Sequence, residues 1–508
     1  MFKDYHRRQD FLLPPSFSEL INQGDLVNFV AEVVDTFDIK PFERRYTHLG
    51  PHAYHPRMML GLLFYAYSQG VFSSRKIAER VRYDVRFMFI AGYQTPDFRT
   101  ISDFRLNHID LIKLYFVKIV RLCRELGLLP LRMVAIDGTK IKANASDVRF
   151  KQRDALAKEL KAVEDEIARM LALAQLTDEK ESTEPEISEL PVTNLQQLRD
   201  QLRQAQARLE SGPERNNVNL TDPDCRIMHG LGSGYNAQLA VDAANGIIVG
   251  TEVVVDSSDA HQLTPMIDQI DLNTESFGAP KIALADSGYT TSTALTELES
   301  RPHISAYVPL QQDVHHERAR QELPPFDKRR FSLDPEKGCG TCPLGQPMRV
   351  VGRSVNKRGL PYVSFAGTVC PNCARRSECT RSRYRYIELL LADPAMERMR
   401  ARMKTAIGQR AMAIRRQTVE PVIGILKEQL GFRRFHLRGL EKVKGEFALL
   451  CSAFNLKKLH HLLNEGSVAR AKRAFSIVSR PTGELFYCVT AILGSIRRMY
   501  QSPLSTYA

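Results

Sequence analysis

One segment near the C-terminal end combines an acid with two cations at helical spacing. Glu420 follows Arg416 by four positions and precedes Lys427 by seven. Residues four and seven positions apart share a face of an α-helix, so a helix would place these three side chains in one stripe. From Met396 to His460 the chain has 15 Lys and Arg residues against five Glu. A carboxylate held between cations in so basic a stretch suits a site that handles metal ions and phosphates.

Two aspartates come at the ends of predicted strands and before glycines. Asp137 follows the apolar run 131–136, and Asp286 follows the run 281–285. Acids at strand ends can project into one cleft at the edge of a sheet. Together with Glu420 they would supply three carboxylates, as needed by two divalent ions about 3.5–4 Å apart in phosphoryl transfer. Carboxylate oxygens suit Mg²⁺, a hard cation. The alternative is two turn residues and one surface glutamate, since Asp-Gly is a good turn.

Five of the nine cysteines form a cluster. They are arranged as Cys339-x2-Cys342, Cys370-x2-Cys373 and then Cys379. Two CxxC pairs indicate a tetrahedral zinc site, because each pair offers two thiolates from one turn. Four of the five would be ligands; we favour the two CxxC pairs, with Cys379 possible in exchange. Redox use and free loop thiols are the alternatives. The predicted role is structural, stabilising an insertion without a core of its own.

Length and charge limit what surrounds these residues. A chain of 508 residues predicts two to four domains. The formal net charge of +13 favours a polyanionic partner such as nucleic acid, although a merely basic enzyme would also fit. The first 19 residues lack the apolar core of a signal peptide, and the best apolar run, 58–67, is too short to span a bilayer. We therefore expect a soluble, intracellular protein.

The first 125 residues or so are predicted to be helical. Ser73 or Ser74 would cap a short basic helix over 75–81, and Thr100 with Asp103 resembles a capping box that opens a helix over 104–126. Short basic helices joined by tight turns fit a helix-turn-helix-like DNA-binding domain, with a plain helical packing domain as the alternative.

The chain from residue 131 onward predicts a mixed α/β sheet. Further strands are expected over 235–241, 247–255 and 304–308, with a hairpin turn at Gly246 and helices over 259–270 and 290–300. The sheet is interrupted twice. Apolar residues in steps of four and three predict a coiled-coil hairpin over 150–215, and the Cys-rich insertion occupies 311–395.

Several motifs together carry a resemblance to a known family. They are Pro96-Asp-Phe-Arg-Thr100, Asp103-Phe-Arg105, Ile136 to Ser146, Thr221-Asp-Pro-Asp224, Tyr235-Asn-Ala-Gln238, Val241-Asp242, Ala285-Asp-Ser-Gly-Tyr289, Gly431-Phe-Arg-Arg-Phe435 and Arg438-Gly439. Over about residues 45–463 the chain resembles bacterial insertion-sequence transposases with a DDE, RNase H-like catalytic core, close to the group numbered eleven eighty-two. The family signature Y-(2)-R-(3)-E-(6)-K fits Arg416, Glu420 and Lys427, but Ala413 stands where the family has tyrosine.

The resemblance implies an activity and a site. Asp137, Asp286 and Glu420 would be catalytic ligands of two Mg²⁺ or Mn²⁺ ions, which assist cleavage at insertion-sequence ends and transfer of the freed 3′-hydroxyl to target DNA. Arg416 and Lys427 would bind DNA phosphates. Lys140 and Lys142 could do the same, or could be solvated surface cations. Double-stranded DNA would be the partner, the protein would act as a homodimer, and its place would be the bacterial cytoplasm, at the nucleoid.

The expected domain organisation follows from these assignments. It comprises a helical DNA-binding domain (1–128), three parts of the catalytic core (129–149, 216–310 and 396–463), the two insertions (150–215 and 311–395) and a basic tail (464–508). Two alternatives stay open at this point: a catalytically impaired DNA-binding regulator derived from a transposase, and an RNase H-fold nuclease.

Overall fold

The computed structural model describes residues 16–46, 52–178, 190–210, 216–275, 278–310, 324–355, 361–391 and 394–464. The predicted tail therefore lies, from residue 465 onward, outside the described residues. The chain divides into two compact units. The first consists of Met1–Pro130, Gly138–Ser257 and Glu420–Ala508, and the second of Leu131–Asp137 and Ser258–Val419. In the described residues, no helix is long and apolar enough to cross a membrane.

The largest sheet is mixed, as the sequence predicts. Its strand order is β4-β5-β1-β7-β8, with β6 paired to β5. The bounds are β1 (Met133–Lys142), β4 (Arg226–Met228), β5 (Gly232–Asp242), β6 (Ile248–Val254), β7 (Ile282–Leu284) and β8 (Ser305–Tyr307). Strand β1 lies between β5 and β7 in this sheet, and the boundary between the two units falls within it, after Asp137.

In the second unit, the first half of β1, β7 and β8 are parallel neighbours. The helices of this unit are α11 (Leu263–Thr274), α12 (Ser292–Glu299), α15 (Pro394–Lys404) and α16 (Ala406–Gly424), the last of which continues past the boundary between the units. Arg402 of α15 donates to the carbonyl of Ala306 in β8 at 3.1 Å. Helix α15 is thereby fastened to the end of this parallel sheet.

The Cys-rich segment of the second unit has a sheet of its own. Five antiparallel strands lie in the order β13-β12-β11-β10-β9. Their bounds are β9 (Ser332–Asp334), β10 (Cys339–Thr341), β11 (Pro347–Val355), β12 (Pro361–Gly367) and β13 (Tyr386–Leu390), and a short helix, α14, covers Arg376–Cys379. The expectation that this insertion lacks a core is wrong, because five side chains are buried together: Phe331, Met348, Val363, Phe365 and Ile387. Four of these five side chains lie on β11, β12 and β13, and Phe331 lies just before β9.

The first unit begins with eight helices in its described residues. They are α1 (Phe17–Leu20), α2 (Leu26–Asp35), α3 (Lys40–Glu43), α4 (Pro56–Ser68), α5 (Ser74–Tyr83), α6 (Val85–Ile90), α7 (Phe98–Asn107) and α8 (Ile109–Glu125). The predicted capping box at Thr100 is wrong. Asp97 caps α7 instead, accepting from the backbone N–H groups of Arg99 and Thr100 at 2.7 and 3.0 Å. An acceptor three residues earlier satisfies the first free N–H groups, so Thr100 and Asp103 lie within α7.

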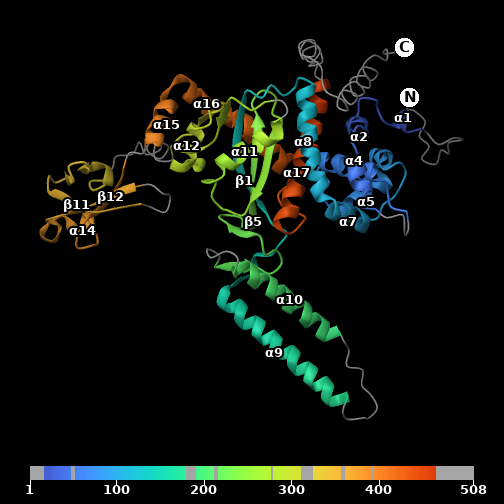
Figure 1. Ribbon diagram of the computed structural model, residues 1–508, viewed down its shortest axis with the longest axis horizontal. Helices are drawn as coiled ribbons and strands as arrows, with labels where there is room; N and C mark the ends of the chain where they lie inside the picture. The colour runs from blue at the N-terminus through green and yellow to red at the C-terminus, as the bar shows by residue number, and fades with distance from the viewer. Residues whose placement is uncertain are drawn as a thin grey trace, which may run out of the picture. The chain divides into compact units, whose positions relative to one another are not determined.

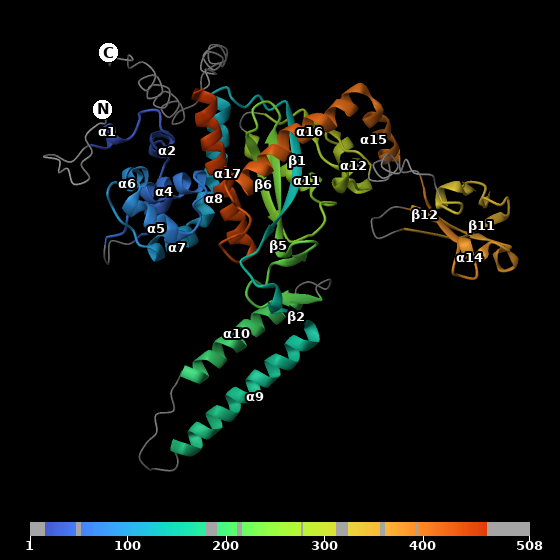
Figure 2. The same ribbon diagram turned by 180° about the vertical axis from the view of Figure 1, so that it is seen from behind.

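The hairpin β5–β6 forms as predicted. Gly246 adopts a left-handed φ of 69°, which a glycine takes without strain, and its N–H donates to the Asp242 carbonyl at 2.9 Å. Figure 2 shows β5 and β6 next to β1 and the C-terminal helix α17 (Leu440–Leu462). Asn455 of α17 ties that helix to β6, because its side chain bonds both the N–H and the carbonyl of Ile248 at 2.9 and 2.8 Å.

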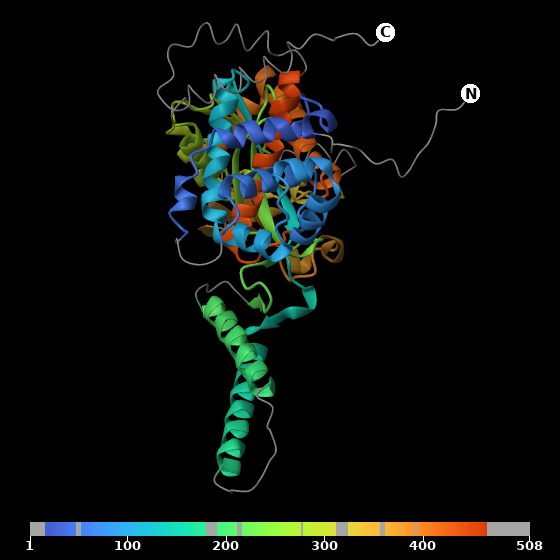
Figure 3. The same ribbon diagram turned by 90° about the vertical axis from the view of Figure 1, so that its right-hand side faces the viewer.

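Two long helices form the segment between β2 (Phe150–Gln152) and β3 (Asn217–Asn219). They are α9 (Arg153–Asp178) and α10 (Leu190–Glu210), and they run side by side in Figures 1 and 3. Apolar residues on both helices share one buried cluster: Leu156, Val163 and Ile167 on α9, and Leu202, Ala205 and Leu209 on α10. Arg203 and Glu164 form an ion pair across the two helices at 2.7 Å. Supercoiling of the pair stays a prediction.

A buried polar network lies where α17 packs against α8 and α4. Glu446 of α17 is fully buried and accepts from Tyr67 Oη at 3.1 Å and from the N–H groups of His436 and Leu437 at 2.9 Å each. Arg105, 4% exposed, lies 4.0 Å from Glu446 and donates to Tyr67 Oη at 2.7 Å. Burial by itself raises the pKa of Glu446, but these hydrogen bonds and the Arg105 charge outweigh it, so its pKa lies below its ordinary value.

Substitution Glu446→Gln should therefore destabilise the folded chain. Removing the buried anion leaves Arg105 without its charge partner, at a cost of about 3–5 kcal/mol. A lowered folded-state pKa means that the ionised carboxylate stabilises the protein above the unfolded pKa and loses this effect as the pH falls. Thermal midpoints should differ most between wild type and variant near pH 7 and converge below about pH 4.5. The exposed Glu441→Gln on the same helix is the control; an equal effect there would contradict this role.

Candidate active site

Asp137 lies within a strand, not at its end. Strand β1 continues through Asp137 to Lys142, so the predicted turn at Asp137-Gly138 is wrong. The strand lies between β5 and β7 in the sheet, and its residues Met133–Ala135 pair with β7. Its interior position in the sheet keeps the backbone extended where the local sequence favours a turn.

Asp286 follows β7 as expected and starts a short 3-10 helix, Ser287–Tyr289. Its Oδ1 accepts from the Gly288 N–H at 2.7 Å. The parallel register pairs Ala135 with Leu284, and Asp137 and Asp286 each lie two residues further along. Side chains two residues apart point to the same face of a sheet, and neighbouring strands are about 4.8 Å apart. The two aspartates therefore each lie two residues beyond the last paired residues of adjacent parallel strands, Asp137 within β1 and Asp286 just after β7.

Several charged side chains beside these strands act electrostatically on Tyr289. Its side chain is fully buried. Burial raises its pKa well above the usual value; the negative charges of Asp259, Asp137 and Asp286 raise the pKa further, and the charge of Arg415 lowers it. Asp259 also lies near the second aspartate, since a Cβ placed on Gly288 would be 3.9 Å from the Asp259 Cβ. Three carboxylates and one guanidinium thus act on the same buried phenol.

Arg415 is the cation of this group, and sequence analysis missed it. Its Nη1 lies 2.9 Å from Asp137 Oδ2, with side chains only 10% and 17% exposed. The predicted phosphate ligand, Arg416, is exposed. The helical periodicity of α16 could have identified Arg415, because Arg415 shares a helix face with the buried residues Ala411, Thr418 and Val422.

Glu420 lies in α16, exposed, at the first position that belongs to the other unit. The predicted stripe of Arg416, Glu420 and Lys427 on one regular helix is wrong. Helix α16 ends at Gly424 and one π-helical stretch follows, Ile425–Gln429. A π-turn changes the angular phase of every later residue, so Lys427 leaves the face that four- and seven-residue spacing assigns to it.

The lysines predicted to bind phosphate have protein partners. Lys427 Nζ donates to Thr139 Oγ1 and to the Lys140 carbonyl, both at 3.1 Å, and burial lowers its pKa. Lys140 Nζ donates to the Ser257 carbonyl at 2.5 Å. Lys142 is exposed, and its backbone bonds to that of Arg433 and Phe435. The ammonium of Lys427 therefore holds the second half of β1 to the π-turn.

Metal ligands are not preassembled in the part of the chain described. Among these residues, no group of three or more His, Cys, Asp and Glu side chains has an arrangement that could hold an ion. Asp137 and Asp286 offer two carboxylates at matching strand positions. Four of the five clustered cysteines line one pocket, as described below.

Two family models match the chain. One, described as a transposase DDE domain, matches residues 341–460, and the other, a transposase domain (DUF772), matches residues 15–107. The chain thus carries a transposase DDE domain and a second transposase domain. The DDE-domain match includes Glu420 and Lys427 but not Asp137 or Asp286, whereas the other match covers the helices up to α7.

Whole-chain comparisons add little to these domain matches. No curated protein matches the transposase. A solved structure, the piggyBac transposase synaptic complex with hairpin DNA, aligns over 95% of this chain and 82% of that one, with 8% identity and a TM-score of 0.31. Similarity at this level carries no argument about the fold or the site.

Arg415 should be essential for the stability of the second unit. Substitution Arg415→Gln leaves a mostly buried Asp137 carboxylate without its partner, which costs about 3–5 kcal/mol. The neighbouring Arg416→Gln removes the same charge from an exposed position and should change stability by no more than about 0.5 kcal/mol. Thermal denaturation of both variants measures the difference. Equal midpoints would show that the ion pair does not stabilise the fold.

Proposed function

We propose that this transposase cuts DNA at the ends of an insertion sequence and joins the freed 3′-hydroxyl to target DNA. Asp137, Asp286 and Glu420 are its catalytic carboxylates, and the mixed sheet is an RNase H-like core. The observation that carries the proposal is that Asp137 and Asp286 each lie two residues beyond the paired residues Ala135 and Leu284 of adjacent parallel strands. Phosphoryl transfer by direct attack of a hydroxyl needs no protein nucleophile, which agrees with a site made of carboxylates.

The residues present fit hard divalent cations. Carboxylate oxygens are the ligands that Mg²⁺ and Mn²⁺ prefer, and three aspartates already place negative charge around Tyr289. Asp137, Asp286 and Glu420 would hold two such ions. Bound there, the ions would stabilise charge on the attacking and leaving oxygens. Arg415 balances Asp137 and positions its carboxylate through Oδ2.

Glu420 is proposed as the third carboxylate because of its place in the matched domain. It lies within the DDE-domain match and at the signature position of the resembling family, with Arg416 four residues earlier. Arg416 is exposed and is our candidate for a phosphate contact, because its guanidinium can bind phosphate with two parallel hydrogen bonds. Ala413, which replaces the family tyrosine, is also exposed, so the substitution removes no buried packing.

The helical domain within residues 1–128 is the proposed reader of transposon ends. Phe98, 36% exposed, lies between two guanidinium groups, with Arg75 at 4.9 Å and Arg99 at 5.8 Å from its ring centroid. Helix α5 adds Lys76, Arg80 and Arg82 around the exposed Tyr83. Cations with exposed rings suit double-stranded DNA, which they contact through phosphates and base edges. Two copies acting together at the nucleoid would allow both ends to be cut.

Neutralising any of the three carboxylates should abolish cleavage while DNA binding persists. The variants are Asp137→Asn, Asp286→Asn and Glu420→Gln. Losing a carboxylate ligand removes several kcal/mol of transition-state stabilisation, so cleavage should fall by about a thousandfold or more. The measurement is excision, in Mg²⁺, of a marked element that retains the natural sequences flanking the gene, alongside binding of the same DNA.

Glu428→Gln is the matched control, since Glu428 is an exposed acid eight residues beyond Glu420, paired with Arg433. It should cut normally. Robust excision by any of the three carboxylate variants would overturn the assignment of that residue. Binding without excision by the wild-type chain would favour a DNA-binding regulator over a transposase that still acts.

The contribution of the basic surface on α5 and α7 to DNA binding can be tested by removing two of its charges. The double variant Arg75→Ala/Arg99→Ala should weaken binding to end DNA about tenfold and reduce the salt dependence of log K by about two, because two phosphate contacts are lost. Lys40→Ala/Arg44→Ala removes the same charge from exposed positions at α3 and should change neither quantity. Equal losses of DNA binding in both double variants would show that only the net charge of the protein matters. That result would contradict a specific DNA-binding surface on α5 and α7.

A further inference from the structure

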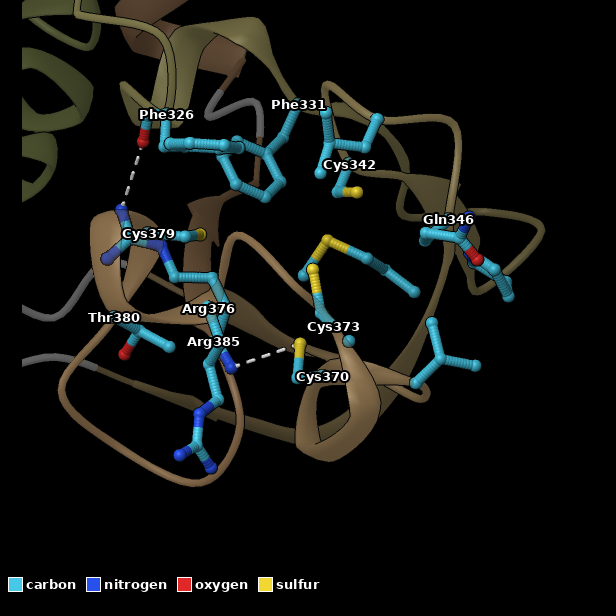
Figure 4. A pocket seen from close by; sticks show the side chains of 15 residues that line it. Phe326, Phe331, Cys342, Gln346, Cys370, Cys373, Arg376, Cys379, Thr380 and Arg385 are labelled. Atoms are coloured by element: carbon cyan, nitrogen blue, oxygen red, sulfur yellow. Dashed lines mark hydrogen bonds between the residues drawn. The ribbon is translucent and has the colours of Figure 1, made fainter.

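Four cysteine side chains of the Cys-rich module line one pocket. They are Cys342, Cys370, Cys373 and Cys379, and Figure 4 shows all four around the same space. The first lies just after β10, the middle two belong to a 3-10 turn, and the last ends helix α14. Three separate segments of the module therefore bring thiols to one place.

Cys342, Cys370 and Cys373 lie in two hydrogen-bonded turns. In the first, Gly345 has a left-handed φ of 74°, and its N–H donates to the Cys342 carbonyl at 2.8 Å. In the second, the Cys373 N–H donates to the Cys370 carbonyl at 3.2 Å. Gly367 packs directly on this turn, because a Cβ there would lie 2.4 Å from Cys370 Sγ. The backbone is thus shaped around the sulfurs.

Cys339 is the member of the cluster that does not take part. It lies in β10 opposite Arg349, is exposed, and does not line the pocket. Cys379 is partly buried and packs against the core of the module. Burial raises the pKa of Cys379, Arg385 lowers it, and Cys370, Cys342 and Cys373 each raise it, as expected of neighbouring thiols.

Two arginines lie beside the same sulfurs. The backbone N–H of Arg385 donates to Cys370 Sγ at 3.5 Å. The side chains of Arg376 and Arg385 also line the pocket. Four thiolates around Zn²⁺ leave a net charge of about −2, which two guanidinium groups would offset.

We infer that Cys342, Cys370, Cys373 and Cys379 bind one structural zinc ion, and that Cys339 is not a ligand. In the residues described, the four thiols are not arranged as a coordination site, so ion binding requires them to move closer together. The spacing favours the two intact CxxC pairs, with Cys379 possible in exchange. The inferred set is the one with this exchange, in which the first pair contributes Cys342 alone.

The test is the zinc content of purified full-length protein, measured by mass spectrometry. Wild type should carry about one zinc per chain. Cys339→Ser should keep it, whereas Cys379→Ser should lose more than half. Because these two variants make the same chemical change within one module, a general effect of losing a thiol would appear in both.

A third variant covers the case in which Cys379→Ser does not fold. Cys379→His supplies a nitrogen ligand that zinc also accepts, so it should retain the ion and the thermal midpoint of wild type. Visible absorption after exchange with Co²⁺ should report tetrahedral thiolate coordination in wild type and Cys339→Ser. Zinc lost with Cys339→Ser but kept with Cys379→Ser would overturn the inference. A wild-type chain that binds no zinc when supplied with it would do the same. Neither result bears on DNA cleavage.

Discussion

A carboxylate inside a sheet requires a nearby positive charge, and Asp137 imposes this requirement on the second unit. An ionised acid that is mostly buried is costly unless it is paired. Arg415 meets the requirement and in doing so fixes the rotation of α16 about its axis. With Arg415 turned inward, Arg416 and Glu420, four residues apart on the same helix, face outward. One ion pair thus decides which side chains of the signature helix are available for DNA and metal.

The same interaction leaves a charge imbalance. The charges of Asp259, Asp137 and Asp286 all raise the pKa of Tyr289, and the charge of Arg415 opposes them. Excess negative charge around a buried ring would repel a DNA phosphate as well as the other carboxylates. Divalent ions would reverse the sign of this potential. On the proposed function, metal binding and substrate entry would therefore be linked, because the cations that would stabilise the reaction are also those that would allow a phosphate to approach.

Features that depend on local chemistry can be predicted from the sequence, whereas features that depend on contacts with residues distant in the sequence cannot. The β5–β6 hairpin follows from Gly246, whose left-handed conformation is a local property. The strand through Asp137 is predicted to end there, because the local sequence contains no sign that it continues to Lys142 as an interior strand of the sheet. Arg415 and Arg416 are both arginines, so composition and charge do not distinguish them. They differ in the face of α16 that they occupy, because Arg415 lies in the row of buried positions. The π-turn holding Lys427 likewise depends on tertiary contacts.

The cysteines extend this reasoning to a module that folds around few buried groups. Spacing identifies the turns, since a CxxC pair is a local motif, but it does not decide which thiols face inward. Cys339 is exposed because β10 directs it away from the pocket, whereas α14 carries Cys379 back to it. Five buried side chains give a core too small to stabilise an independent sheet, as is general for units of this size. A metal that joins three segments would supply what this core lacks, which gives a physical reason for the ligand set to span the module.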